Sequence, residues 1–260
     1  MTLQIRYLYD SRELLWNWMR REFRIRYSQA VLGVLWTVLQ PTALMLIFTV
    51  VFSSILKVDT GNIPYPAFVY IGLLSWNFFA SAVGAASSSV GDHMSIVSKV
   101  AFPREILPFS IILVSLLDFL IAASIFVVLL VYYQIPIGSA ALFVPAIVIA
   151  QMALITGISL LTASVYVRYR DVRFIVPIVL QMWFFINPIF YSTQNVPQQF
   201  QLLYYFNPMA VFIGAFRSVI FLNQLPDLVS FGIASGVSLL VLLIGYAVFK
   251  KAESKFADIA

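Results

Sequence analysis

The chain has 260 residues and a net charge of +5; 62% of the residues are hydrophobic and only 10% are charged. Soluble domains carry about 25% charged residues, and a soluble fold of this length could not bury so much apolar surface, so the sequence predicts a membrane protein. The absence of cysteine excludes disulfides and thiolate metal sites. No repeat or linker divides the chain, and we expect residues 1–260 to form a single transmembrane domain.

The first element expected is an amphipathic helix over residues 11–27, with the sequence SRELLWNWMRREFRIRY. At 100° per residue, Glu13, Asn17 and three arginines fall in one polar sector, flanked by apolar side chains. A helix of this kind lies in the interface of a membrane. It is either an anchor on the lipid surface or a docking surface for a cytoplasmic partner, and composition alone favours the anchor.

Six stretches are long and apolar enough to cross a hydrocarbon core of about 30 Å. They are Leu35–Leu56, Ala67–Val90, Ile106–Tyr133, Leu142–Val167, Ile175–Tyr191 and Leu228–Phe249. The sequence therefore predicts an all-α integral membrane protein with six transmembrane helices.

The basic residues orient this arrangement. Fourteen of them fall in segments that lie on one side of the membrane, and only Lys57 and Arg217 fall on the other. By the positive-inside rule, both termini are expected in the cytoplasm. A seventh span at Met209–Leu222 would reverse the C-terminus, so we interpret residues 192–227 as an outer segment with re-entrant or interfacial helices between spans five and six.

Two cytoplasmic loops carry charged motifs. In the loop over residues 92–105, Pro103 and Glu105 suit the start of the third span, and the loop is either a solvated helix start or a lever that transmits motion from a partner. Residue chemistry alone favours the helix start. The loop VRYRDVRF carries Arg168, Arg170 and Arg173, which are either ordinary positive-inside charges or a site for an anionic headgroup.

Few residues offer chemistry inside the membrane. Asp118 is the only ionisable residue deep in a span, and it is either a proton or ion site or, as we favour, a structural carboxyl. His93 stands without other metal-ligating residues, and no catalytic set of carboxylates or histidines occurs, so we expect neither a metal site nor an enzyme. There is also no GxxxxGK[ST] loop, so the chain is not expected to bind ATP in that way.

Aromatic residues make up 16% of the chain and crowd the second span, the fifth span and the segment that follows it. They form either the aromatic belt of a membrane protein or the lining of a sugar-conducting channel, because aromatic faces pack against the apolar C–H groups of sugar rings. The candidates for such a lining are Trp76, Phe78, Phe79, Trp183, Phe184, Phe190 and Tyr191.

Five segments in this order carry a family resemblance: RYSQAVLGVLWTVLQP, YIGLLSWNFF, SKVAFPREILP, VRYRDVRFIVP and FNPMAVFIGAFR. The chain resembles the membrane permease subunit of ATP-binding-cassette polysaccharide exporters, the type 2 exporters of O antigen, capsule and teichoic acid. A drug or lipid exporter of the same superfamily is the alternative. An ion-coupled secondary transporter fits less well, because it would show paired intramembrane charges and inverted repeats.

The resemblance implies a homodimer in the bacterial inner membrane, two ATPase subunits that bind ATP and Mg, no cofactor on this chain, and a lipid-linked glycan as cargo. It implies coupling to the ATPase through Trp16, Arg20, Arg24, Lys99, Pro103, Arg104 and Glu105. It makes Arg26, Arg168, Arg170 and Arg173 candidates for binding the lipid pyrophosphate or another headgroup.

Overall fold

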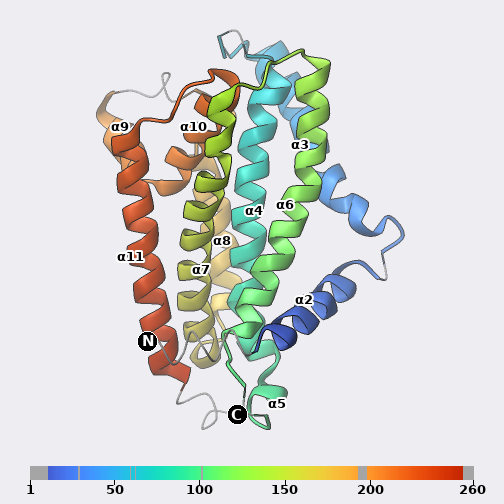
Figure 1. The fold of residues 1–260 in the computed structure, drawn as a ribbon, viewed down its shortest axis with the longest axis vertical. Coiled ribbons are helices and arrows are strands. Elements are labelled where there is room, and N and C mark those ends of the chain that lie inside the picture. The colour runs from blue at the N-terminus through green and yellow to red at the C-terminus, as the bar shows by residue number, and fades with distance from the viewer. Residues whose placement is uncertain are drawn as a thin grey trace.

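The computed structural model describes residues 11–28, 30–58, 60–61, 63–100, 102–192 and 198–253. In this part of the chain the regular structure is helical and no strand occurs. Long helices stand side by side, and one shorter helix, α2, crosses them obliquely near one end (Figure 1). The all-α fold expected from the sequence is confirmed.

The N-terminal part contains the interface helix and the first apolar helix. Helix α2 runs over Arg12–Tyr27 and buries Trp18 and Met19, although the Ser11 side chain makes no cap hydrogen bond. A 3-10 turn at Gly33–Leu35 leads into α3 (Trp36–Phe48), which contains Pro41 and continues as a π-helical segment over Thr49–Ile55. Much of the surface of Gly33–Ser53, the segment that contains α3, is exposed, since only 11% of the residues in its most apolar 18-residue stretch are buried.

Helix α4 (Tyr65–Asp92) is the centre of the molecule, with 78% of its most apolar window buried. The chain then forms the short helix α5 (Met94–Val97) and the long helix α6 (Ile106–Tyr132). Helix α6 begins at the residue predicted from the sequence. Because α4 packs against neighbours on most of its faces, it fixes the positions of the helices around it.

Helix α7 (Val144–Arg168), which follows a 3-10 turn at Ser139–Phe143, packs closely against the last helix, α11 (Leu228–Glu253). A Cβ atom built on Gly245 would lie 2.3 Å from the Gly157 carbonyl oxygen, so only glycine fits there. Small residues allow two helix backbones to approach in this way when the solvent is lipid.

Between α7 and α11 lie α8 (Val172–Ile186), α9 (Gln198–Tyr205) and α10 (Pro208–Phe221). Helix α8 ends before the predicted limit of the fifth span, Tyr191. The physical reason is Pro188, which disfavours helical geometry at the preceding Asn187; that residue has an extended ψ of 146°.

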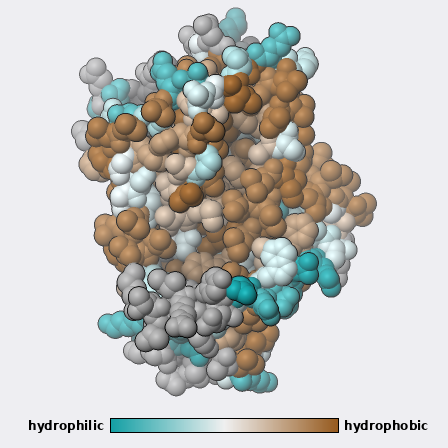
Figure 2. All heavy atoms as spheres, viewed as in Figure 1, coloured by the Kyte–Doolittle hydropathy of each residue, from teal (hydrophilic) through white to brown (hydrophobic). Residues whose placement is uncertain are grey.

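Among the residues that the structure describes, five helical segments are long and apolar enough to cross a membrane: Gly33–Ser53, Tyr65–Asp92, Ile106–Tyr132, Ser139–Arg168 and Leu228–Glu253. Helices α8 and α10 are apolar but shorter. The face shown in Figure 2 is hydrophobic over its middle and more hydrophilic at its upper and lower ends, as expected for a protein surrounded by lipid.

The two ends of the molecule differ in content (Figure 1). One end, which we call the α5 end, holds α5, the start of α6, the turn between α7 and α8, and the end of α11. The opposite end, which we call the α10 end, holds α9 and α10. The segments with most of the basic residues therefore lie together at the α5 end.

Candidate functional site

The interface helix α2 is held at the α5 end through Trp18. The Trp18 ring meets the His93 ring edge-on at 5.2 Å and stacks on Phe102 at 6.4 Å. The Arg21 guanidinium lies over the same indole, 4.6 Å from its centroid. These contacts join α2 to the segments before and after α5.

His93 has a defined pattern of hydrogen bonds. Its Nδ1 lies 2.9 Å from the Ser89 carbonyl oxygen, so Nδ1 donates. Its Nε2 lies 3.1 Å from Arg21 Nη1 and accepts, because a guanidinium has only donors. His93 is therefore a structural link between α4 and α2, a role that sequence reasoning missed.

The residues predicted to contact an ATPase fall into two groups. The first is exposed: Trp16 is 51% exposed, the Arg20 guanidinium lies 5.0 Å from its ring, and Arg24 and Lys99 are exposed as well. These four side chains are accessible at the surface of the described structure.

The second group contacts the C-terminal helix instead. Glu105 is only 1% exposed and forms an ion pair with Lys250 of α11. The Arg104 side chain donates to the Glu253 carbonyl, and Lys250 lies 2.8 Å from the Glu253 carboxylate. Pro103 is also buried. In this conformation these residues tie the start of α6 to the end of α11, and Glu105 has little surface left for a partner protein.

The candidates for a headgroup site do not gather in one place. Arg168, Arg170 and Arg173 are exposed on the turn between α7 and α8. Arg26, at the end of α2, instead forms an ion pair with Asp118 of α6. The structure brings the three loop arginines together and leaves Arg26 apart from them.

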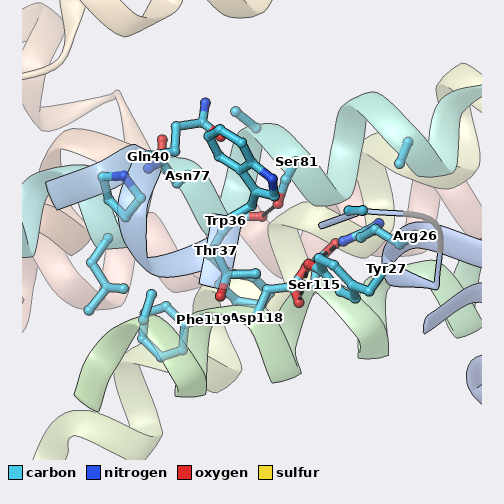
Figure 3. A pocket seen from close by; sticks show the side chains of 17 residues that line it. Arg26, Tyr27, Trp36, Thr37, Gln40, Asn77, Ser81, Ser115, Asp118 and Phe119 are labelled. Atoms are coloured by element: carbon cyan, nitrogen blue, oxygen red, sulfur yellow. Dashed lines mark hydrogen bonds and ion pairs between the residues drawn. The ribbon is translucent and has the colours of Figure 1, made fainter. Parts of the chain in front are cut away.

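Asp118 receives two donors from α2. Arg26 Nη1 binds one carboxylate oxygen, and the Tyr27 hydroxyl donates to the other at 2.8 Å. Burial, followed by the hydrogen bond to Asp118, raises the pKa of Tyr27 above its ordinary value, so the phenol stays a donor. Figure 3 shows Arg26 and Tyr27 pointing toward Asp118. This contact agrees with the structural carboxyl favoured from the sequence.

Beside this ion pair lies a partly open cavity of about 620 Å³, lined by residues of α2, α3, α4 and α6 (Figure 3). Its polar lining includes Gln40 of α3 and Asn77 of α4, and Ser115 lies next to Asp118 on α6. Its apolar lining includes Trp36 and Phe119. Sequence reasoning missed this cavity, although Gln40 and Asn77 were visible as amides inside apolar runs.

Most of the aromatic residues predicted to line a channel form a cluster between α3, α4, α8 and the residues after α8, whereas Phe78 contacts Phe119 of α6. Phe79 meets Trp183 at 5.1 Å, and Phe184 meets Phe190 at 5.5 Å. Trp76, Phe78 and Phe79 are 4%, 2% and 0% exposed, and Phe78 lines the cavity beside Asp118. Trp183, Phe184 and Tyr191 are half-buried and Phe190 is buried. Contact of Trp76 or Phe79 with cargo would require a rearrangement.

Arg217 is a further residue whose role the sequence did not reveal. It is 7% exposed and donates to the carbonyl oxygens of Pro188 and Ile189 at 2.7 Å each. It also donates to the Phe68 carbonyl at 3.2 Å and lies over the Phe68 ring. A lone arginine in an apolar segment indicates such an internal role, because a charge facing lipid is expensive.

Among the residues that the structure describes, no three His, Cys, Asp or Glu side chains come together as metal ligands. The site is thus a set of contacts at one end of a helical bundle and a cavity whose mostly apolar lining includes several polar side chains.

Comparison with known proteins identifies the family. The model of the ABC-2 type transporter family matches residues 13–221. The chain is 30% identical over 257 residues to the O-antigen export system permease protein RfbA of Myxococcus xanthus, with 98% of each chain covered. It is 28% identical over 260 residues to a protein of the same name from Klebsiella pneumoniae, covering 100% of this chain and 98% of that one.

A more distant relative is the polysialic acid transport protein KpsM of Escherichia coli, 24% identical over 243 residues, with 90% of this chain and 91% of the relative covered. The family and these relatives, together with the apolar helices, show a multi-pass membrane permease of a transport system. The chain belongs to the ABC-2 type transporter family.

Proposed function

We propose that this chain is the channel-forming permease subunit of an ATP-driven exporter that moves lipid-linked polysaccharide from the cytoplasm across the bacterial inner membrane. The observation that carries the proposal is the similarity over nearly the whole chain to permeases named for O-antigen export. The polar side chains in the cavity and the basic α5 end support it, because a glycan needs polar contacts and a cytoplasmic ATPase needs a docking surface.

In the proposed topology the chain crosses the membrane six times. Helix α8 has 15 residues and spans about 22 Å, less than the hydrocarbon thickness of about 30 Å. Residues 187–191 would extend it to the opposite interface. The α7–α8 turn lies at the α5 end and α11 begins at the α10 end, so the chain passes from one end to the other between them. Helices α9 and α10 would then be re-entrant.

The orientation follows from charge. The α5 end carries Lys99, Arg104, the three loop arginines and Lys250, so it would face the cytoplasm, with both termini there. The exposed surface around Trp16, Arg20, Arg24 and Lys99 would receive an ATPase subunit that binds ATP and Mg. Pro103, Arg104 and Glu105 would pass its motion to α6 and α11.

Two copies of the chain would form the channel, since one set of six helices is too few to enclose a glycan. The half-buried aromatic residues Trp183, Phe184 and Tyr191 would contact sugar rings on the way out. Arg168, Arg170 and Arg173 would bind the pyrophosphate of the lipid carrier, because the guanidinium fork matches phosphate geometry.

The test is to co-express the chain with the ATPase of its own transporter, purify the pair and reconstitute it in vesicles. We expect co-purification, a dimer of the permease, an ATPase rate that changes when lipid-linked glycan is added, and ATP-dependent glycan movement. Transport driven by an ion gradient without the ATPase would contradict the proposal. A response to hydrophobic drugs or plain phospholipid, but not to glycolipid, would replace the proposed cargo.

A further inference from the structure

The cavity between α2, α3, α4 and α6 contains a buried hydroxyl group with no partner. The Ser115 side chain is 0% exposed and lines the cavity, and its oxygen forms no hydrogen bond with the described residues. A buried polar atom without a partner loses about 1–3 kcal/mol relative to one that is satisfied. The Ser115 hydroxyl therefore shows that the described residues leave a polar group unsatisfied in the wall of the cavity.

Other polar groups around the cavity point to the same conclusion. The amides of Gln40 and Asn77 line it and make no hydrogen bonds to the part of the chain that the structure describes. Pro41 has no N–H, so the Thr37 carbonyl lacks its usual helical donor. These groups sit on apolar membrane helices, where contact with lipid tails would be costly. An occupant that both donates and accepts hydrogen bonds would satisfy them.

The charge of the lining restricts the occupant. Among the described residues that line the cavity, only Arg26 and Asp118 are charged, and they form an ion pair. Both carboxylate oxygens of Asp118 are already bonded. The lining is therefore neutral overall and has no excess positive charge for phosphate. The indole ring of Trp36, which is 52% exposed, adds an aromatic face at the cavity.

We propose that this cavity binds a neutral sugar unit of the transported glycan, with the Gln40 and Asn77 side chains bonded to its hydroxyl groups and Trp36 beside its ring. The inference rests on the proposed export of glycan and adds a sugar site within one protomer. A volume of about 620 Å³ falls within the range of small-molecule sites. In this proposal Arg26 is part of the wall of the sugar site and is held by Asp118, so we do not propose it as a ligand of the lipid pyrophosphate.

Because this chain has no cysteine, a protection experiment is possible without background labelling of the permease itself. Ser81 is exposed at the cavity, so S81C introduces one reactive thiol there. S124C is the matched control, because Ser124 is exposed on α6 but does not line the cavity. Both variants, assembled with the ATPase in membrane vesicles, are labelled with the neutral reagent N-ethylmaleimide, with or without glucose, galactose, mannose, rhamnose, N-acetylglucosamine or inorganic pyrophosphate.

We expect at least one of the neutral sugars to slow labelling of S81C and to leave S124C unchanged. At a sugar concentration of about ten times Kd the labelling rate should fall about tenfold, because about a tenth of the sites stay empty. Protection by pyrophosphate alone would overturn the proposal in favour of an anion site. Protection by none of the probes, or no labelling of S81C, would overturn it in favour of a cavity that holds only water or is covered by another chain.

Variants separate this proposal from the proposed function. Q40L and N77L remove amides from the cavity, and Q224L is the control, since Gln224 is exposed in the loop before α11. We expect Q40L and N77L to insert and assemble normally but to lose sugar protection and most glycan export. If the unmodified transporter exports glycan and both variants export it equally well, the proposed sugar site is wrong and the proposed function stands. If the unmodified transporter moves no glycan, the proposed function fails.

Discussion

At the scale of single residues, the contact of Arg26 with Asp118 places two opposite charges inside the bundle. Their side chains are 27% and 14% exposed, so the pair is only partly screened by solvent. The two residues are 92 positions apart in sequence, and Tyr27 donates to the same carboxylate. The pair therefore fixes the end of α2 against the middle of α6.

We predict that D118A lowers the free energy of unfolding by about 1–3 kcal/mol, because Arg26 and Tyr27 both lose their acceptor. The measurement is the thermal stability of the detergent-solubilised protein, followed by size exclusion. The double variant R26L/D118L should recover most of the loss, since it leaves no isolated charge. Equal instability of the single and double variants would show that the ion pair is not the cause.

Two tryptophans on α2, two positions apart, should have opposite phenotypes. Trp18 is 9% exposed and contacts His93 and Phe102, whereas Trp16 is 51% exposed. We predict that W18A destabilises the permease by about 3–5 kcal/mol, the usual loss for a buried tryptophan. W16A should leave thermal stability unchanged and reduce co-purification of the ATPase. If W16A binds the ATPase normally, this face of α2 does not form the docking surface.

At the scale of helices, the contact of α7 with α11 depends on glycine. We predict that G245A lowers stability by about 1–3 kcal/mol, because its methyl group would overlap the backbone at Gly157. G236A on the same helix is the control, since no atom lies within 4 Å of the Cβ position there. It should be neutral or slightly stabilising. Equal thermal shifts for both variants would contradict the close approach.

The start of α6 and the end of α11 are joined by the Glu105–Lys250 ion pair, which gives a second prediction at this scale. E105K should reduce both stability and export, because two buried or half-buried lysines would then repel each other. The exchange E105K/K250E should restore both. If the exchange restores stability but not export, Glu105 acts on the partner ATPase rather than through α11.

The sequence predicted the helices that have long apolar runs between polar flanks. Residues 106–133 and 228–249 were expected as spans, and α6 and α11 occupy Ile106–Tyr132 and Leu228–Glu253. The end of α8 was not predicted, because hydropathy continues through Asn187-Pro188 while the backbone leaves the helix there. Hydropathy reports where a chain is apolar, whereas a helix end depends on local dihedral preference.

Contacts between segments that lie far apart in the chain were harder to predict from the sequence. The pairing of Arg26 with Asp118 and of Glu105 with Lys250 depends on how helices pack, and neither residue type nor spacing reveals it. The aromatic residues of α4 also illustrate this limit. Trp76 and Phe79 are on the side of α4 that faces α8, and their burial follows from that contact rather than from their sequence.

At the scale of the whole molecule, packing is uneven. Helix α4 is largely buried, and α7 and α11 are in backbone contact at Gly157 and Gly245. Helix α3 lies at the other extreme, with 11% of its most apolar window buried. The surface of α3 is therefore open to the proposed second copy and to the surrounding lipid, whereas most of α4 is covered by other helices of the same chain.

The proline and the π-helical segment of α3 have a mechanical consequence. Pro41 removes one hydrogen bond from the middle of the helix, and Thr49–Ile55 has wider turns than an α-helix. A helix bends first at such weakened positions, which act as joints, before its regular parts deform. The stretch of α3 that carries Trp36, Thr37 and Gln40 lies on the α2 side of both joints. It can therefore swing with α2 and alter the width of the cavity while the other end of α3 stays in place.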